Sequence, residues 1–105
     1  MNPRLDKLLA MERQKPDDAF LKFAIAQEYA GMNNDMEARK RFELLLNQAP
    51  QYIATYYQLG KLYERLNEVK LAAEIYQKGV VAAKAANDFK TSGELNEALI
   101  LLEDE

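Results

Sequence analysis

The sequence predicts an all-α protein in which one helical hairpin is followed by a second copy of itself. The first observation is a repeat of 34 residues that keeps large, small and aromatic residues in a fixed order. The matching pairs are Ile25 and Leu59, Ala26 and Gly60, Tyr29 and Tyr63, Asn33 and Asn67, Ala38 and Ala72, Phe42 and Tyr76, and Pro16 and Pro50. The second observation is the helical spacing of apolar residues from Leu5 to Leu102. A fixed period of this length is typical of stacked helical hairpins.

Three helices are expected in the first half of the chain, over residues 3–14, 18–31 and 36–48. Lys15-Pro16 ends the first, because proline cannot continue a helix and disfavours helical geometry in the residue before it. Asp17 or Asp18 is expected to cap the second helix, since an acidic side chain accepts hydrogen bonds from free amides. Asn33-Asn34-Asp35 predicts a turn in which asparagine takes left-handed geometry and Asp35 caps the third helix.

Three more helices are expected in the second half, over residues 52–66, 69–86 and 89–102. Ala49-Pro50 ends the third helix, and Asn67 turns the chain after the fourth. The fifth helix has no proline to stop it, so we extend it to the turn at Asn87-Asp88. Phe89 is expected to anchor the last helix.

The repeat positions carry a family resemblance. The order aromatic-x2-Leu-Gly-x2-Tyr followed by Ala-x3-aromatic resembles the tetratricopeptide repeat. The second copy matches through Tyr56, Leu59, Gly60, Tyr63, Ala72 and Tyr76, and the first through Ile25, Ala26, Tyr29, Ala38, Phe42 and Pro50. The first copy has Lys22 in place of the usual large aromatic residue, and the second has Lys84 in place of the closing proline.

The resemblance implies an α-α superhelix, a right-handed stack of antiparallel helical hairpins. Repeat one would span 18–50 and repeat two 52–86, with capping helices at 3–14 and 89–102, all within a single domain of residues 1–105. Both caps are needed because two repeats alone would leave apolar faces exposed.

Composition argues against several classes of function. The chain has no histidine and no cysteine, so it lacks a histidine-based triad, a thiolate nucleophile and an ordinary zinc site. We therefore expect no enzymatic activity, no metal and no cofactor. The net charge of −3 and the glutamates around Arg39-Lys40-Arg41 argue against nucleic acid as a partner. No segment is long and apolar enough to cross a membrane, so a cytoplasmic protein is expected.

The expected function is that of an adaptor or scaffold that binds a peptide or another protein. In the family that the chain resembles, the first helices of successive hairpins line a concave groove. This places the candidate groove residues at Phe20, Phe23, Gln27, Tyr57, Lys61 and Arg65. Lys61 and Arg65 would favour a partner with an apolar anchor and an acidic group. Alternatively, Phe20 and Phe23 pack against the N-terminal helix and make up for Lys22.

The last helix suggests a second possibility. Ala98 to Leu102 are five consecutive apolar residues, more than one buried face requires. Ile100 and Leu101 point away from the stripe that would face the core. Either they join two copies of the chain in a homodimer, or residues of a longer parent protein cover them. Scattered exposed apolar residues are also common in monomers.

Overall fold

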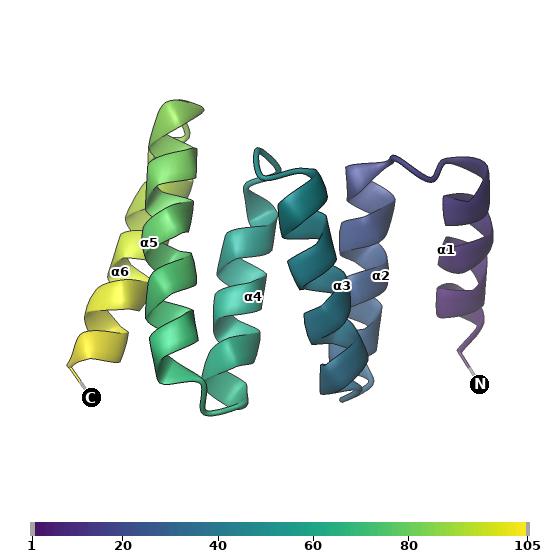
Figure 1. Ribbon diagram of the computed structural model, residues 1–105, viewed down its shortest axis with the longest axis horizontal. Coiled ribbons are helices and arrows are strands. Elements are labelled where there is room, and N and C mark those ends of the chain that lie inside the picture. Colours follow the sequence, from purple (N-terminus) through teal and green to yellow (C-terminus); the bar gives the residue numbers. More distant parts are fainter. Residues whose placement is uncertain (1, 105) are drawn as a thin grey trace. The chain divides into compact units, whose positions relative to one another are not determined.

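The computed structural model describes residues 2–104, and Figure 1 shows that part of the chain as a series of helices joined by short turns. Six α-helices occupy it: α1 (Pro3–Gln14), α2 (Ala19–Gly31), α3 (Asp35–Gln48), α4 (Ala54–Arg65), α5 (Val69–Ala85) and α6 (Phe89–Glu103). No strand occurs within residues 2–104. The all-α prediction is confirmed, and the helix bounds differ from the expected ones by at most two residues.

The chain divides into two compact units, Met1–Ala49 and Pro50–Glu105. In the first unit α2 packs against both α1 and α3, and in the second unit α5 packs against both α4 and α6. Each unit therefore holds one predicted hairpin, α2–α3 or α4–α5, together with one predicted capping helix. That the whole chain acts as a single domain stays a prediction.

Side chains close the N-terminal ends of four helices. The side-chain oxygens of Asn2, Asp18, Asn34 and Asp88 accept hydrogen bonds from the amides of Leu5, Leu21, Glu37 and Thr91. The prediction that Asp35 caps α3 is therefore wrong, because Asn34 is the cap and Asp35 is the first helical residue. At α6, hydrogen bonds from Thr91 stabilise the charged form of Asp88 and lower the pKa of its carboxyl group.

One turn recurs three times along the chain. Asn33, Asn67 and Asn87 have φ angles of 61°, 61° and 59°, the left-handed region that asparagine tolerates better than most residues. In each case the amide of the following residue donates to a carbonyl at the end of the preceding helix, over 2.9, 2.8 and 2.8 Å. The repeated asparagines thus end α2, α4 and α5 in the same way.

Two glycines allow the helices of the second unit to approach closely. A Cβ atom on Gly60 of α4 would collide with the ring of Tyr76 on α5. A Cβ atom on Gly79 of α5 would lie 2.6 Å from the Cβ of Tyr56 and 2.9 Å from the Cδ1 of Leu95. Gly79 therefore lets α5 contact α4 and α6 at the same level. Gly60 was expected from the repeat, whereas Gly79 was not.

In repeat one, other residues occupy the positions at which the two helices of the hairpin pack against each other. Ala26 and Ala38 are fully buried at the positions of Gly60 and Ala72, and Phe23 packs edge-on against Phe42 with ring centroids 5.8 Å apart. Lys22 and Leu45 occupy the positions that correspond to Tyr56 and Gly79. Where repeat two has a tyrosine and a glycine, repeat one therefore has a lysine and a leucine.

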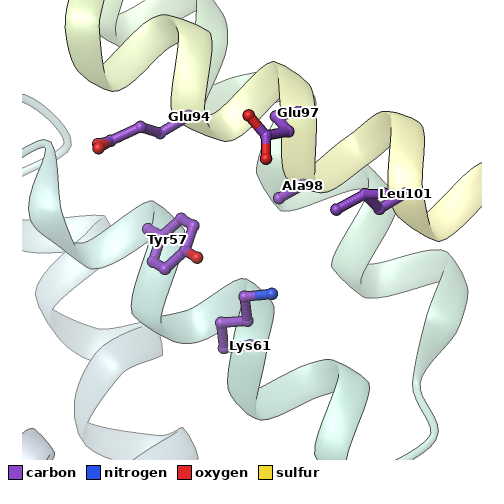
Figure 2. Close-up of a pocket in the computed structure, with 6 residues that line it drawn as sticks. All are labelled: Tyr57, Lys61, Glu94, Glu97, Ala98 and Leu101. Atoms are coloured by element: carbon purple, nitrogen blue, oxygen red, sulfur yellow. The ribbon is translucent and has the colours of Figure 1, made fainter.

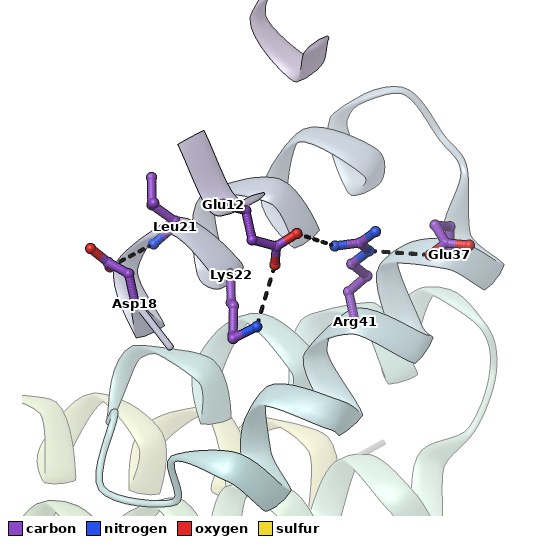
Figure 3. Close-up of polar contacts among 6 residues, drawn as sticks. All are labelled: Glu12, Asp18, Leu21, Lys22, Glu37 and Arg41. Carbon is purple, nitrogen blue, oxygen red and sulfur yellow. Dashed lines mark hydrogen bonds and ion pairs between the residues drawn. The ribbon is translucent and has the colours of Figure 1, made fainter. Parts of the chain in front are cut away.

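Lys22 has a role that the sequence did not reveal. Its Nζ lies 3.4 Å from Oε2 of Glu12 on α1, and Arg41 on α3 reaches Oε1 of the same carboxylate at 3.3 Å (Figure 3). Arg41 also pairs with Glu37 at 3.2 Å and lies over the ring of Tyr29. Glu12 thus connects the capping helix α1 to both helices of hairpin one.

Phe89 and Phe20 are both exposed, although each was considered as a residue that packs against a neighbouring helix. Phe89 is 66% exposed, so the prediction that it anchors the last helix is wrong. Leu95, Ala98 and Leu102 are buried and hold α6 instead. Phe20 is 63% exposed, so it does not fill the space left by Lys22.

Candidate functional site

A pocket of about 390 Å³ lies between α4 and α6 of the second unit. Its lining residues are Tyr57, Lys61, Glu94, Glu97, Ala98 and Leu101. Figure 2 shows Tyr57 and Lys61 on one wall and the four residues of α6 on the other, with the carboxylate of Glu97 directed into the space between.

Helical spacing brings these side chains to one place. Tyr57 and Lys61 are four residues apart, so they lie one above the other on α4. On α6, Glu94, Glu97, Ala98 and Leu101 follow the spacing of one helix face. The neighbouring stripe, Leu95, Ala98 and Leu102, is buried and sets the rotation of α6, so the pocket residues lie beside the core.

The α4 wall combines an aromatic ring and a cation. The Nζ of Lys61 lies 5.4 Å from the ring centroid of Tyr57 and 3.7 Å from Oε2 of Glu64. Tyr57 in turn contacts the buried ring of Tyr76 at 6.4 Å between centroids. The ring of Tyr57 and the carboxylate of Glu64 thus both give the charge of Lys61 a partner within its own helix.

A tyrosine hydroxyl fixes the carboxylate that pairs with Lys61. Tyr76 donates its hydroxyl hydrogen to Oε2 of Glu64. Burial, followed by this hydrogen bond and the charge of Glu64, raises the pKa of Tyr76 above its usual value. The phenol therefore remains a donor, and Glu64 is held where Lys61 reaches it.

The α6 wall is acidic at its edge and apolar at its base. Glu94 and Glu97 are exposed, and among residues 2–104 neither carboxylate has an ion-pair partner. Ala98 is buried, while Leu101 is 58% exposed. The pocket therefore offers two free carboxylates, one cation that already has a partner, and an apolar surface formed by Tyr57, Ala98 and Leu101.

The six residues predicted for the groove belong to both units. Tyr57 and Lys61 come together in the pocket, whereas Arg65 does not line it. Phe20, Phe23 and Gln27 lie on α2 in the other unit, where the ring of Phe23 contacts Phe42. Whether these four residues take part in binding stays a prediction.

Sequence reasoning missed one wall of the pocket. Glu94, Glu97 and Ala98 were not singled out, and Leu101 was assigned to self-association. A signal was present, because Glu94, Glu97 and Leu101 each precede a member of the apolar stripe Leu95, Ala98 and Leu102. That spacing indicates the flank of the core stripe, but it does not say which flank faces α4.

A second pocket, of about 460 Å³, lies in the first unit. Its lining residues are Glu12, Arg13, Pro16, Lys22, Glu37, Lys40, Arg41 and Leu44. Four of its charged side chains form the network centred on Glu12 and Arg41. These four side chains pair with one another and connect α1 to α2 and α3, so we assign them a structural role.

Other chemical features are few in the described part of the chain. No group of three or more carboxylates within residues 2–104 could hold a metal ion. In the same span, the helices are too short or too polar to cross a bilayer. Arg39 pairs with Glu43 and Arg41 with Glu37, so this basic run is matched by acidic neighbours.

Comparison with known proteins gives structural matches. The solution structure of a tetratricopeptide repeat domain protein from Salinibacter ruber is 38% identical, with a TM-score of 0.82 over 85% of this chain and 90% of that chain. A crystal structure of a tetratricopeptide repeat domain protein from Salinibacter ruber is also 38% identical, with a TM-score of 0.78 over 82% and 97%. A protein from Bordetella parapertussis is 25% identical, with a TM-score of 0.84 over 99% and 90%. No family model and no curated protein matches the sequence.

Proposed function

We propose that this chain, which belongs to the tetratricopeptide repeat family, is an adaptor. It binds a segment of another protein in the pocket between α4 and α6. The family consists of protein-interaction repeats. The observation that supports this location is the pocket itself, where Tyr57 and Leu101 offer partly exposed apolar surface next to polar groups. Aromatic residues in such settings often supply much of the binding energy.

The geometry suits one or two side chains rather than a large ligand. A volume of about 390 Å³ is at the lower end of ligand pockets, which span roughly 300–1,000 Å³. Its base is formed by Ala98, a small residue that leaves room above it. A peptide would insert an aliphatic side chain between Tyr57 and Leu101, and its neighbouring residues would meet the charged edge.

A displayed library of random peptides would test this proposal. Peptides selected on the wild-type protein should lose about tenfold or more in affinity, about 1.4 kcal/mol, for Leu101→Ser. Ile100→Ser is the matched control, since Ile100 is also an exposed apolar residue of α6 but does not line the pocket. Circular dichroism should show both variants to be as helical as the wild type. Equal affinity of the two variants for every selected peptide would contradict the proposed site.

Self-association is a second candidate, and one observation favours it. Ile100 is 50% exposed on α6, and Phe89, also exposed, lies about three turns earlier on the same face. Light scattering should then report a homodimer, which Ile100→Glu should convert to a monomer. A wild-type protein that is monomeric at high concentration would exclude this alternative.

A further inference from the structure

We infer that the segment which binds between α4 and α6 is basic, with a lysine or arginine beside its aliphatic anchor. This inference rests on the proposed function and deepens it. It differs from the sequence-based expectation of an acidic partner, which depended on Lys61 and Arg65 alone. The reason for the difference is the second wall, Glu94 and Glu97, which the repeat pattern did not include.

The pocket charges that lack a partner among residues 2–104 determine which charge the bound segment should carry. Lys61 is 3.7 Å from Glu64 and lies over the ring of Tyr57, so an incoming carboxylate would have to compete with Glu64 for the ammonium group. Glu94 and Glu97 have no such partner among residues 2–104. A cation in the partner would therefore form new ion pairs, whereas an anion would meet two like charges.

Position also favours a basic residue next to an apolar one. Glu94 and Glu97 are three residues apart on α6, and residues at that spacing are neighbours on the helix surface, about 5–6 Å apart between Cβ atoms. Ala98 and Leu101 continue the same face. A partner that places its aliphatic side chain against Leu101 would bring the adjacent side chain toward the two glutamates.

Two blocked synthetic nonapeptides form the probe. One has a central leucine flanked by two arginines, and the other has glutamates in place of both arginines. Titration of ¹⁵N-labelled protein, followed by NMR, reports the affinity and the amides that shift. We expect the arginine peptide to shift the amides around Tyr57, Glu94 and Leu101 and to bind at least about tenfold more tightly than the glutamate peptide. Added salt should weaken its binding, because exposed charges are screened.

Variants of the two glutamates complete the test. The double change Glu94→Gln and Glu97→Gln should lower the affinity for the arginine peptide about tenfold. Changing both residues to lysine should reverse the preference in favour of the glutamate peptide. Glu74→Gln with Glu103→Gln is the control, since it alters the net charge equally with exposed glutamates that do not line the pocket.

Three outcomes would overturn the inference. The first is equal or tighter binding of the glutamate peptide at this pocket, and the proposed function would survive it. The second is binding of the arginine peptide that shifts amides elsewhere and is unaffected by the glutamine variant. The third is binding of neither peptide up to about 1 mM. Failure of the proposed function itself is recognised separately, when peptides selected from the library bind Leu101→Ser and Ile100→Ser equally.

Discussion

Tyr56 of α4 lies directly over Gly79 of α5, so closely that a Cβ atom on the glycine would be 2.6 Å from the Cβ of the tyrosine. The same Cβ atom would be 2.9 Å from Leu95 of α6. The hydroxyl of Tyr56 also donates to the carbonyl of Pro50 over 2.7 Å. One side chain thus fixes the approach of α5 and the start of the second unit, and the pocket depends on the resulting position of α6.

Gly79→Ala should lower the free energy of unfolding by about 1–3 kcal/mol, because the methyl group must displace two packed helices. Gly93→Ala is the matched control, since a Cβ atom there would meet no other part of the described chain, residues 2–104, within 4 Å. Replacing that exposed helical glycine should instead raise stability by about 0.5–1 kcal/mol. Urea denaturation of both variants measures the difference. Shifts of the same sign would show that α5 does not approach its neighbours as described.

Glu12→Gln should lower the free energy of unfolding by about 1–2 kcal/mol, because the carboxylate accepts charged hydrogen bonds from Lys22 and Arg41. The side chain of Glu12 is only 19% exposed, so water screens it incompletely. Arg4→Gln removes another ion pair of α1, which joins Arg4 to Glu28. The side chain of Arg4 is 73% exposed. That change should cost less than about 0.5 kcal/mol. Chemical denaturation that finds equal losses would remove the special role assigned to Glu12.

Asn67→Ala should destabilise the protein by about 1 kcal/mol, because alanine is strained at the left-handed φ of 61°. Asn67→Gly should be close to neutral, since glycine takes positive φ without a steric penalty. Thermal unfolding of the pair isolates the backbone effect from the loss of the side chain. If glycine destabilised as much as alanine, the asparagine side chain rather than the turn geometry would be responsible.

Thr55→Val should leave stability unchanged or raise it by up to about 1 kcal/mol, because the fully buried Oγ1 has no hydrogen-bond partner among residues 2–104. The same substitution at Thr91 should have the opposite effect, since the side chain of that threonine hydrogen-bonds to Asp88. Differential scanning calorimetry would compare the two. A strong loss of stability for Thr55→Val would indicate that its hydroxyl has a polar partner after all.

The repeat pattern predicted the fold well because it depends on local periodicity. Helix bounds and the recurring asparagine turn follow from residues near one another in sequence, and the close crossing at Gly60 follows from its place in the repeat pattern. Gly79 was not predicted, because the matching residue of repeat one is Leu45, so no recurring small residue marks this position. Its neighbours Tyr56 and Leu95 lie on two other helices. Nothing in the spacing of a lone glycine says which side chains it will meet.

The candidate site was predicted only in part, for a related reason. The α4 wall was found because Tyr57 and Lys61 lie beside the recognisable repeat positions. The α6 wall lies outside both repeats, so its rotation depends on how Leu95 and Leu102 pack in three dimensions. The sequence-based expectation of an acidic partner depended on Lys61 and Arg65, because the repeat pattern does not include Glu94 and Glu97 on the opposite wall.

Site-specific photocrosslinking tests the proposed pocket most directly. A benzophenone amino acid would be introduced at position 101 in one variant and at position 100 in another, and each irradiated with a peptide selected on the wild-type protein. Leu101 lines the pocket and Ile100 does not, although the two are adjacent on α6. We predict an adduct at position 101 and little or none at position 100. An adduct at position 100 with none at 101 would contradict the pocket between α4 and α6 as the binding site.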